Sequence, residues 1–260
     1  MTTANSAMTN KILLSALAAG TLALGASPAN ADAWSFQIEP YLLGVTIDGD
    51  AGIGRVTGVD VDVNTNDIID NLDLGGMLHF EARHESGWGL ALDYAFMELS
   101  DDITGPRGGV LDAELFQGVF EAQLVKSTRS RDDDEQLDYF VGLRWWDNDV
   151  DVEIDPVILP GTVTSNVEED WVDLVIGVRW KNPINEKWSF LLKGDIGAGE
   201  ADFTALGTIG FRYRIGELTE LDLGYKALAV DYETGKPGQP GYFKYDTTTH
   251  GPVIGLMFKF

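Results

Sequence analysis

The feature that most constrains the fold is an alternation of large apolar residues with small or polar ones along most of the chain. The segment Trp88–Phe96 (WGLALDYAF) places a large apolar residue at every second position. Successive side chains of a β-strand point to opposite faces, so a period of two predicts strands. The same period occurs in the segments 78–83, 116–124, 137–145, 172–180, 190–196, 209–215 and 221–227. Strands of this length suffice to cross a membrane.

The connections between these segments alternate between short and long. Short ones are expected at His84–Gly87, Ser127–Glu135, Asn182–Lys187 and Gly216–Thr219. Long ones are expected at Asp48–Gly75, Ser100–Gly109, Asp147–Asn166 and Glu233–Gly241. Short turns at one end and long loops at the other are typical of a transmembrane up-and-down antiparallel β-barrel, with periplasmic turns and extracellular loops.

Counting the outer segments Trp34–Ile47 and Phe243–Phe260 gives an all-β barrel of about ten strands. The residues 48–75 form a long first loop in this interpretation, with a short helix at Asn66–Leu72. The loop also contains Val56–Val63, which alternates. If that segment joins the wall, the count becomes about twelve, and eight strands is the less favoured alternative.

The N-terminal residues 1–31 are expected to be a signal peptide rather than part of the fold. Lys11 precedes the apolar run Ile12–Ser27, and Ala29-Asn30-Ala31 is an A-x-A cleavage site, which predicts export by the general secretory route. Translation could start at Met1 or Met8. Residues 32–260 then form a single barrel domain.

Composition limits the function classes. The chain has no cysteine, which excludes disulfides, thiolate metal sites and cysteine nucleophiles. Its net charge is −24, so nucleic acid is not an expected partner. No later stretch is apolar enough for a transmembrane helix, so only a closed barrel would allow this chain to span a membrane.

Two faces of the strands differ, and three features favour lipid over a protein core on the apolar face. Tryptophans lie near strand ends, as at membrane interfaces. The chain ends in an alternating aromatic strand. The polar face carries nearly balanced charges, which suits a confined lumen. This predicted lumen charge network comprises Glu81, Arg83, Asp93, Glu121, Asp138, Arg144, Asp173, Arg179, Lys193, Asp195, Arg212, Asp222 and Lys226.

The sequence resembles bacterial outer-membrane β-barrel proteins of the porin-like type. The resemblance is carried by the signal peptide, the alternating strands and the terminal ladder Ile254, Leu256, Phe258 and Phe260. It implies an outer-membrane location. It also implies that the ladder is an assembly signal, with the barrel-assembly machinery, periplasmic chaperones, outer-membrane lipid and lipopolysaccharide as partners.

The functional expectation is a narrow, cation-preferring channel for small ions or solutes, or else a structural barrel. One alternative is a lipid-modifying enzyme that uses His79, beside Glu81 and Asp93, or His250, which follows three threonines. Another is an adhesin acting through acidic loops. Enzyme activity is the minority hypothesis, because no catalytic motif surrounds either histidine. No catalytic residue, metal site or cofactor is predicted.

Overall fold

The structure is a computed structural model that describes residues 33–104, 110–129, 135–155 and 163–260. The predicted signal peptide lies outside the described residues. The chain divides into two compact units, Met1–Trp34 and Ser35–Phe260, and the second carries the β-structure. No described helix is long and apolar enough to cross a membrane.

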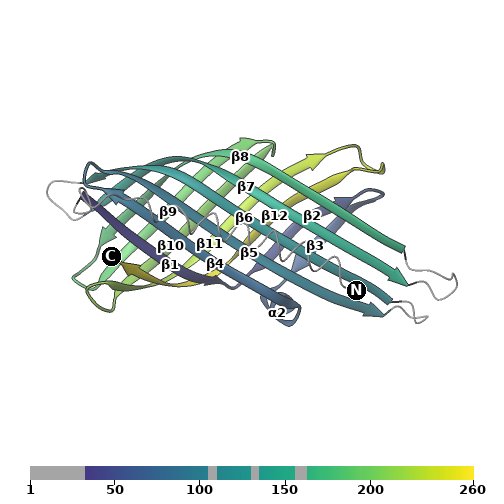
Figure 1. Cartoon of the computed structure of the whole chain (residues 1–260), viewed down its shortest axis with the longest axis horizontal. Coiled ribbons are helices and arrows are strands. Elements are labelled where there is room, and N and C mark those ends of the chain that lie inside the picture. Colours follow the sequence, from purple (N-terminus) through teal and green to yellow (C-terminus); the bar gives the residue numbers. More distant parts are fainter. Residues whose placement is uncertain (1–32, 105–109, 130–134, 156–162) are drawn as a thin grey trace. The chain divides into compact units, whose positions relative to one another are not determined.

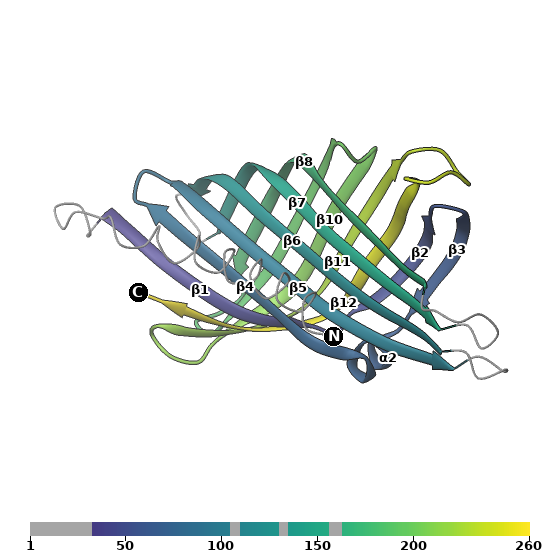
Figure 2. The same ribbon diagram turned by 45° about the vertical axis from the view of Figure 1, so that its right-hand side comes forward.

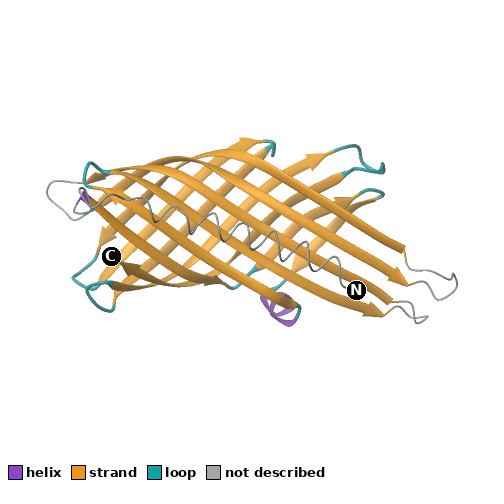
Figure 3. Ribbon diagram, viewed as in Figure 1, coloured by secondary structure: helices purple, strands orange, loops and turns teal. Residues whose placement is uncertain are grey.

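The second unit is built from antiparallel strands, which form one twelve-stranded sheet, and a short helix α2 (Figure 3). The strands are β1 (Trp34–Leu43), β2 (Thr46–Ile53), β3 (Val56–Val63), β4 (Leu72–His84), β5 (Trp88–Thr104), β6 (Val110–Arg129), β7 (Gln136–Asp155), β8 (Val163–Pro183), β9 (Trp188–Gly199), β10 (Phe203–Arg214), β11 (Thr219–Thr234) and β12 (Phe243–Lys259). Helix α2 spans Thr65–Asp70 and begins with a capping box formed by Asn64 and Asp67.

The barrel closes because β1 pairs with both β4 and β12 (Figure 1). Ten strands, β1 and β4 to β12, therefore form the closed wall, which confirms the predicted all-β antiparallel barrel of about ten strands. The remaining strands, β2 and β3, form a hairpin that extends the sheet from β12.

Strands β1 and β2 act as one long strand in two pieces. Leu43 pairs with Val253 and Thr46 pairs with His250, so both pieces follow β12 in the same register. At the break, the Gly44 N–H donates to the Pro252 carbonyl at 2.8 Å. Figure 2 shows β2 and β3 continuing beside β12 after β1 ends.

The predicted long loops Asp48–Gly75 and Asp147–Asn166 are mostly strand, and Ser100–Gly109 is strand as far as Thr104, which corrects these predictions. Strand β5 runs to Thr104, and the β7–β8 hairpin extends to Asp155 and Val163. In the β7 extension, Val150, Val152 and Ile154 alternate with acidic residues, which is consistent with a strand. Backbone ladder bonds to neighbouring strands continue through both extensions. We call this end of the barrel the ribbon end, and the end with the short turns the turn end.

The outward face of the wall is a band of exposed large apolar side chains. Leu143, Leu174 and Ile176 are each more than half exposed and lie on adjacent strands. Soluble proteins rarely expose a continuous apolar surface of this extent. Aromatic residues border the band near the strand ends, among them Trp88 and Trp188 at the turn end.

Candidate functional site

The candidate site is the barrel interior, where alternate residues of the wall strands meet. All thirteen residues of the predicted lumen charge network lie on the inward faces of β4 to β11. The network is divided into several clusters along the barrel.

The first cluster, near the turn end, joins two arginines to two carboxylates. Arg179 donates to both oxygens of Glu81, at 2.8 and 2.9 Å, and to Asp138 at 2.7 Å. Arg83 donates to Glu81 at 2.6 Å and to Asp138 at 2.9 Å. Glu81 and Asp138 are almost fully buried, so each charge is compensated by both arginines.

The second cluster surrounds Arg144, whose side chain is completely buried. Its guanidinium donates to Glu121 at 2.8 Å, to Asp195 at 2.9 Å and to Thr204 at 2.8 Å. Asp173 lies opposite Arg144 in the ladder, with their Cα atoms paired. Its carboxylate accepts the Ala201 N–H at 2.9 Å in the β9–β10 turn.

The third cluster contains three residues that the sequence prediction missed, Glu39, Glu220 and Lys259. Arg212 pairs with Asp222, and more loosely with Glu39 at 3.5 Å and Glu220 at 3.8 Å. Lys259 binds Glu220 at 2.6 Å. The alternation of Gln37, Glu39 and Tyr41 along β1 was a signal that could have revealed Glu39.

The fourth cluster places His79 among carboxylates, on the lining of an interior cavity. Its Nδ1 lies 3.1 Å from Asp93, and its Nε2 lies 3.6 Å from Glu81. Tyr41 donates to Asp93 at 2.7 Å, and Lys226 lies 3.9 Å from the same carboxylate. This arrangement is that of a buried ion cluster.

The interior contains two cavities of unequal size. The larger, about 380 Å³, is lined by charged side chains and extends to Ser35 and Phe260 at the turn end. The smaller, about 50 Å³, lies among mostly apolar side chains towards the ribbon end. Asp93, Glu121 and Lys226 line both cavities and therefore stand between them.

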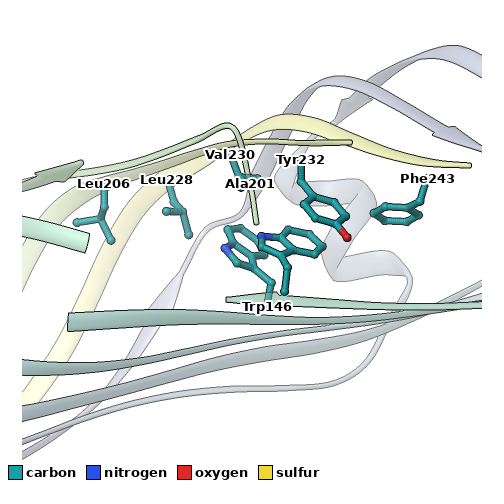
Figure 4. Close-up of a cluster of buried hydrophobic side chains, with 8 residues drawn as sticks. Trp146, Ala201, Leu206, Leu228, Val230, Tyr232 and Phe243 are labelled. Atoms are coloured by element: carbon teal, nitrogen blue, oxygen red, sulfur yellow. The ribbon is translucent and has the colours of Figure 1, made fainter. Parts of the chain in front are cut away.

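An aromatic cluster lies beyond the smaller cavity, towards the ribbon end (Figure 4). Trp146 stacks on Trp171 with ring centres 5.4 Å apart, and Trp171 stacks on Tyr232 at 4.0 Å. Both indoles are at most 1 % exposed. Because Trp146 and Trp171 come from β7 and β8 and Tyr232 from β11, the cluster bridges strands on different sides of the interior.

The second candidate histidine, His250, lies on the outward face of β12. Its Nδ1 is 2.6 Å from the Tyr225 hydroxyl, and its Nε2 is 2.6 Å from Asp48. Its described partners do not include the preceding threonines that were considered as nucleophiles. The terminal ladder residues Ile254, Leu256, Phe258 and Phe260 share this outward face.

Carboxylates of neighbouring strands lie side by side at the ribbon end, on the outward face of the sheet. Asp60, Asp50, Asp246 and Asp231 form a row across β3, β2, β12 and β11. Burial, together with the negative charges of Asp246 and Asp202, raises the pKa of Asp231 above the ordinary value for aspartate. In the described part of the chain, no group of three or more acidic or histidine side chains has an arrangement that could hold a metal ion.

Comparison with known proteins gives similarity of fold. No protein-family model and no curated protein matches the chain. The translocator domain of the autotransporter NalP from Neisseria meningitidis superposes with a TM-score of 0.50 at 10% identity, covering 98% of both chains. Ail of Yersinia pestis gives 0.40 at 9% identity over 87% of this chain and 98% of its own. The chain thus has the closed β-barrel fold found in outer-membrane proteins.

Proposed function

We propose that the protein is an outer-membrane barrel whose lumen is closed, so that it acts as a structural barrel rather than an open porin. The proposal is supported by two groups of side chains that block the interior one after the other. Arg144 with its partners and the Trp146–Trp171 stack are both almost fully buried, and the larger cavity lies on the turn-end side of them. An open pore would instead require a continuous water-filled path.

Planar-bilayer recording of the purified, refolded protein tests this proposal. The wild-type protein should give no steady conductance. The Trp146→Ala variant should remain closed as well, because the Arg144 cluster is still in place. Stable conductance steps from the wild-type protein would overturn the structural-barrel proposal.

A second candidate is a gated, narrow channel that prefers cations. It is favoured by the two cavities, which are separated where Lys226 and Asp93 form the loosest of the inner ion pairs, at 3.9 Å. The carboxylate row at the ribbon end would concentrate cations at that mouth. Brief openings with a cation-selective reversal potential in a salt gradient would support this candidate, and anion selectivity would reject it.

We infer the location and partners from the same features. The apolar outward band would lie in outer-membrane lipid, with the turn end in the periplasm and the ribbon end facing lipopolysaccharide and the exterior. The general secretory route would deliver the chain. Periplasmic chaperones and the barrel-assembly machinery would then read the ladder Ile254, Leu256, Phe258 and Phe260. Fractionation of envelopes expressing the full chain tests the location.

A further inference from the structure

The larger cavity has more positive than negative side chains, although the whole chain is strongly acidic. Seven lysines and arginines line it, against five aspartates and glutamates. The carboxylates are already engaged: Asp138 by two arginines, Asp222 and Glu39 by Arg212, and Asp93 by His79 and Lys226. Glu121 is held by Arg144 and lies 3.7 Å from Lys193. Two carboxylates that do not line the cavity also engage its cations: Glu81 binds Arg83 and Arg179, and Glu220 binds Lys259. The positive charge left without a carboxylate is therefore that of Lys181.

Lys181 is the cation without a matched carboxylate. It lies on the inward face of β8, opposite Gln136 of β7 and Leu191 of β9, and it lines the cavity. No described carboxylate lies within ion-pair distance of its Nζ. An amine held in a partly enclosed site without a counterion is costly.

The charges around Lys181 increase this imbalance. Those that act on its amine most strongly are Arg212, Glu220, Lys259 and Arg83, three cations and one carboxylate. The carboxylate, Glu220, already binds Lys259 at 2.6 Å. An anion placed beside Lys181 would thus be attracted by several positive charges at once.

We propose that the turn-end cavity is a binding site for a small oxyanion, a phosphate- or carboxylate-bearing solute, with Lys181 as its principal ligand. The volume of about 380 Å³ lies within the range of small-molecule sites. Leu191, Val253 and Met257 provide an apolar strip on the lining, which suits a solute with a short non-polar part. Entry is from the turn end, where the lining reaches Ser35 and Phe260.

Inorganic phosphate is the probe for the test. The full-length mature protein in alkyl maltoside micelles, which contain no phosphorus, is titrated with phosphate at constant ionic strength, and the ³¹P line width is followed. The wild-type protein should broaden the line saturably, and added sulfate should reverse the broadening. Lys181→Gln should weaken binding at least tenfold.

Two further variants separate loss of the site from loss of charge or fold. Lys181→Arg keeps a cation and should bind within a few-fold of the wild type. Lys187→Gln removes an exposed lysine from the adjacent β8–β9 turn and should bind as the wild type does. No broadening by the wild-type protein, or equal broadening by Lys181→Gln, would overturn the proposal.

This site goes beyond the structural role and does not depend on it. Conductance tests whether the lumen is closed, whereas phosphate binding tests the cavity alone. A conducting protein that binds phosphate through Lys181 would reject the closed barrel and keep the site. A closed barrel that does not bind phosphate would reject the site and keep the structural-barrel proposal.

Discussion

Arg144 illustrates how a charged side chain is accommodated in the barrel interior. Its guanidinium donates hydrogen bonds to the carboxylates of Glu121 and Asp195 and compensates their negative charges. Replacing Arg144 with Met should lower the free energy of unfolding by about 3–5 kcal/mol, because buried Asp195 loses its counterion and Glu121 loses the nearer of its two cations. Urea unfolding in micelles, followed by tryptophan fluorescence, measures the change.

The control for Arg144→Met is Lys187→Met, which removes an exposed cation and should leave the unfolding midpoint nearly unchanged. If Arg144→Met unfolds at the wild-type urea concentration, the cluster contributes no net stability and the prediction is wrong.

Glycines on the inward face have a packing reason. A Cβ on Gly177 would lie 2.4 Å from the Gly194 carbonyl oxygen and 2.4 Å from the Phe140 ring. A Gly177→Ala substitution should therefore destabilise the barrel by about 1–3 kcal/mol, since backbone and ring must both shift. Gly207→Ala is the matched control, because nothing lies within 4 Å of its Cβ position. Equal stability of the two variants would contradict this explanation.

At the residue scale, the sequence predicted which side chains face inward but not which of them form ion pairs with one another. The period of two is a property of each strand, so it places Arg144 and Asp195 correctly without any knowledge of their neighbours. Pairing depends on the stagger between strands and on side-chain reach. Arg144 consequently binds Glu121 on the neighbouring strand β6 and Asp195 on β9, two strands away. Glu39 was missed because β1 was identified only as a wall segment, without its inward-facing residues being assigned.

At the element scale, the seam between β1 and β12 carries the closure of the wall. Phe36 and Phe260 exchange two backbone hydrogen bonds of 3.0 Å, and their rings stack with centres 6.0 Å apart. Deleting Phe260 should reduce the amount of folded barrel several-fold, because the deletion removes both bonds and the last residue of the predicted assembly signal. The measurement is the heat-modifiable fraction on gels of isolated envelopes.

A Phe203→Ala variant serves as the control for the Phe260 deletion. Phe203 is also an exposed aromatic residue, but it lies at the start of β10, away from the seam. If both variants assemble equally well, the terminal aromatic residue has no special role.

The wall strands with an apolar outward side were predictable, whereas the strand extensions at the ribbon end were not. The segment 147–155 is rich in aspartate and reads as a solvated loop, yet its backbone continues the β7 ladder. The alternation of Val150, Val152 and Ile154 with acidic residues was a signal for this strand, but the density of aspartates favoured a loop. The hairpin β2–β3 was recognisable only through the alternation of Val56–Val63.

At the scale of the whole molecule, the exposed apolar band makes detergent or lipid a requirement. The protein without residues 1–31 should fold to a compact, heat-modifiable form in micelles and aggregate in plain buffer, because water would contact side chains such as Ile176 and Leu174 around the wall. Sedimentation with and without detergent measures this. A monomeric folded protein in buffer alone would contradict the membrane assignment.

The shared register of β1 and β2 along β12 also determines when the wall can close during folding. Residues near the start of the mature chain must find residues near its end, over almost the entire length of β12. Contacts so distant in sequence form slowly, because a very large loop has to be ordered first. Until the final strand has been delivered, both margins of the nascent sheet remain available to other polypeptides, and this waiting period is when the protein most needs protection from self-association.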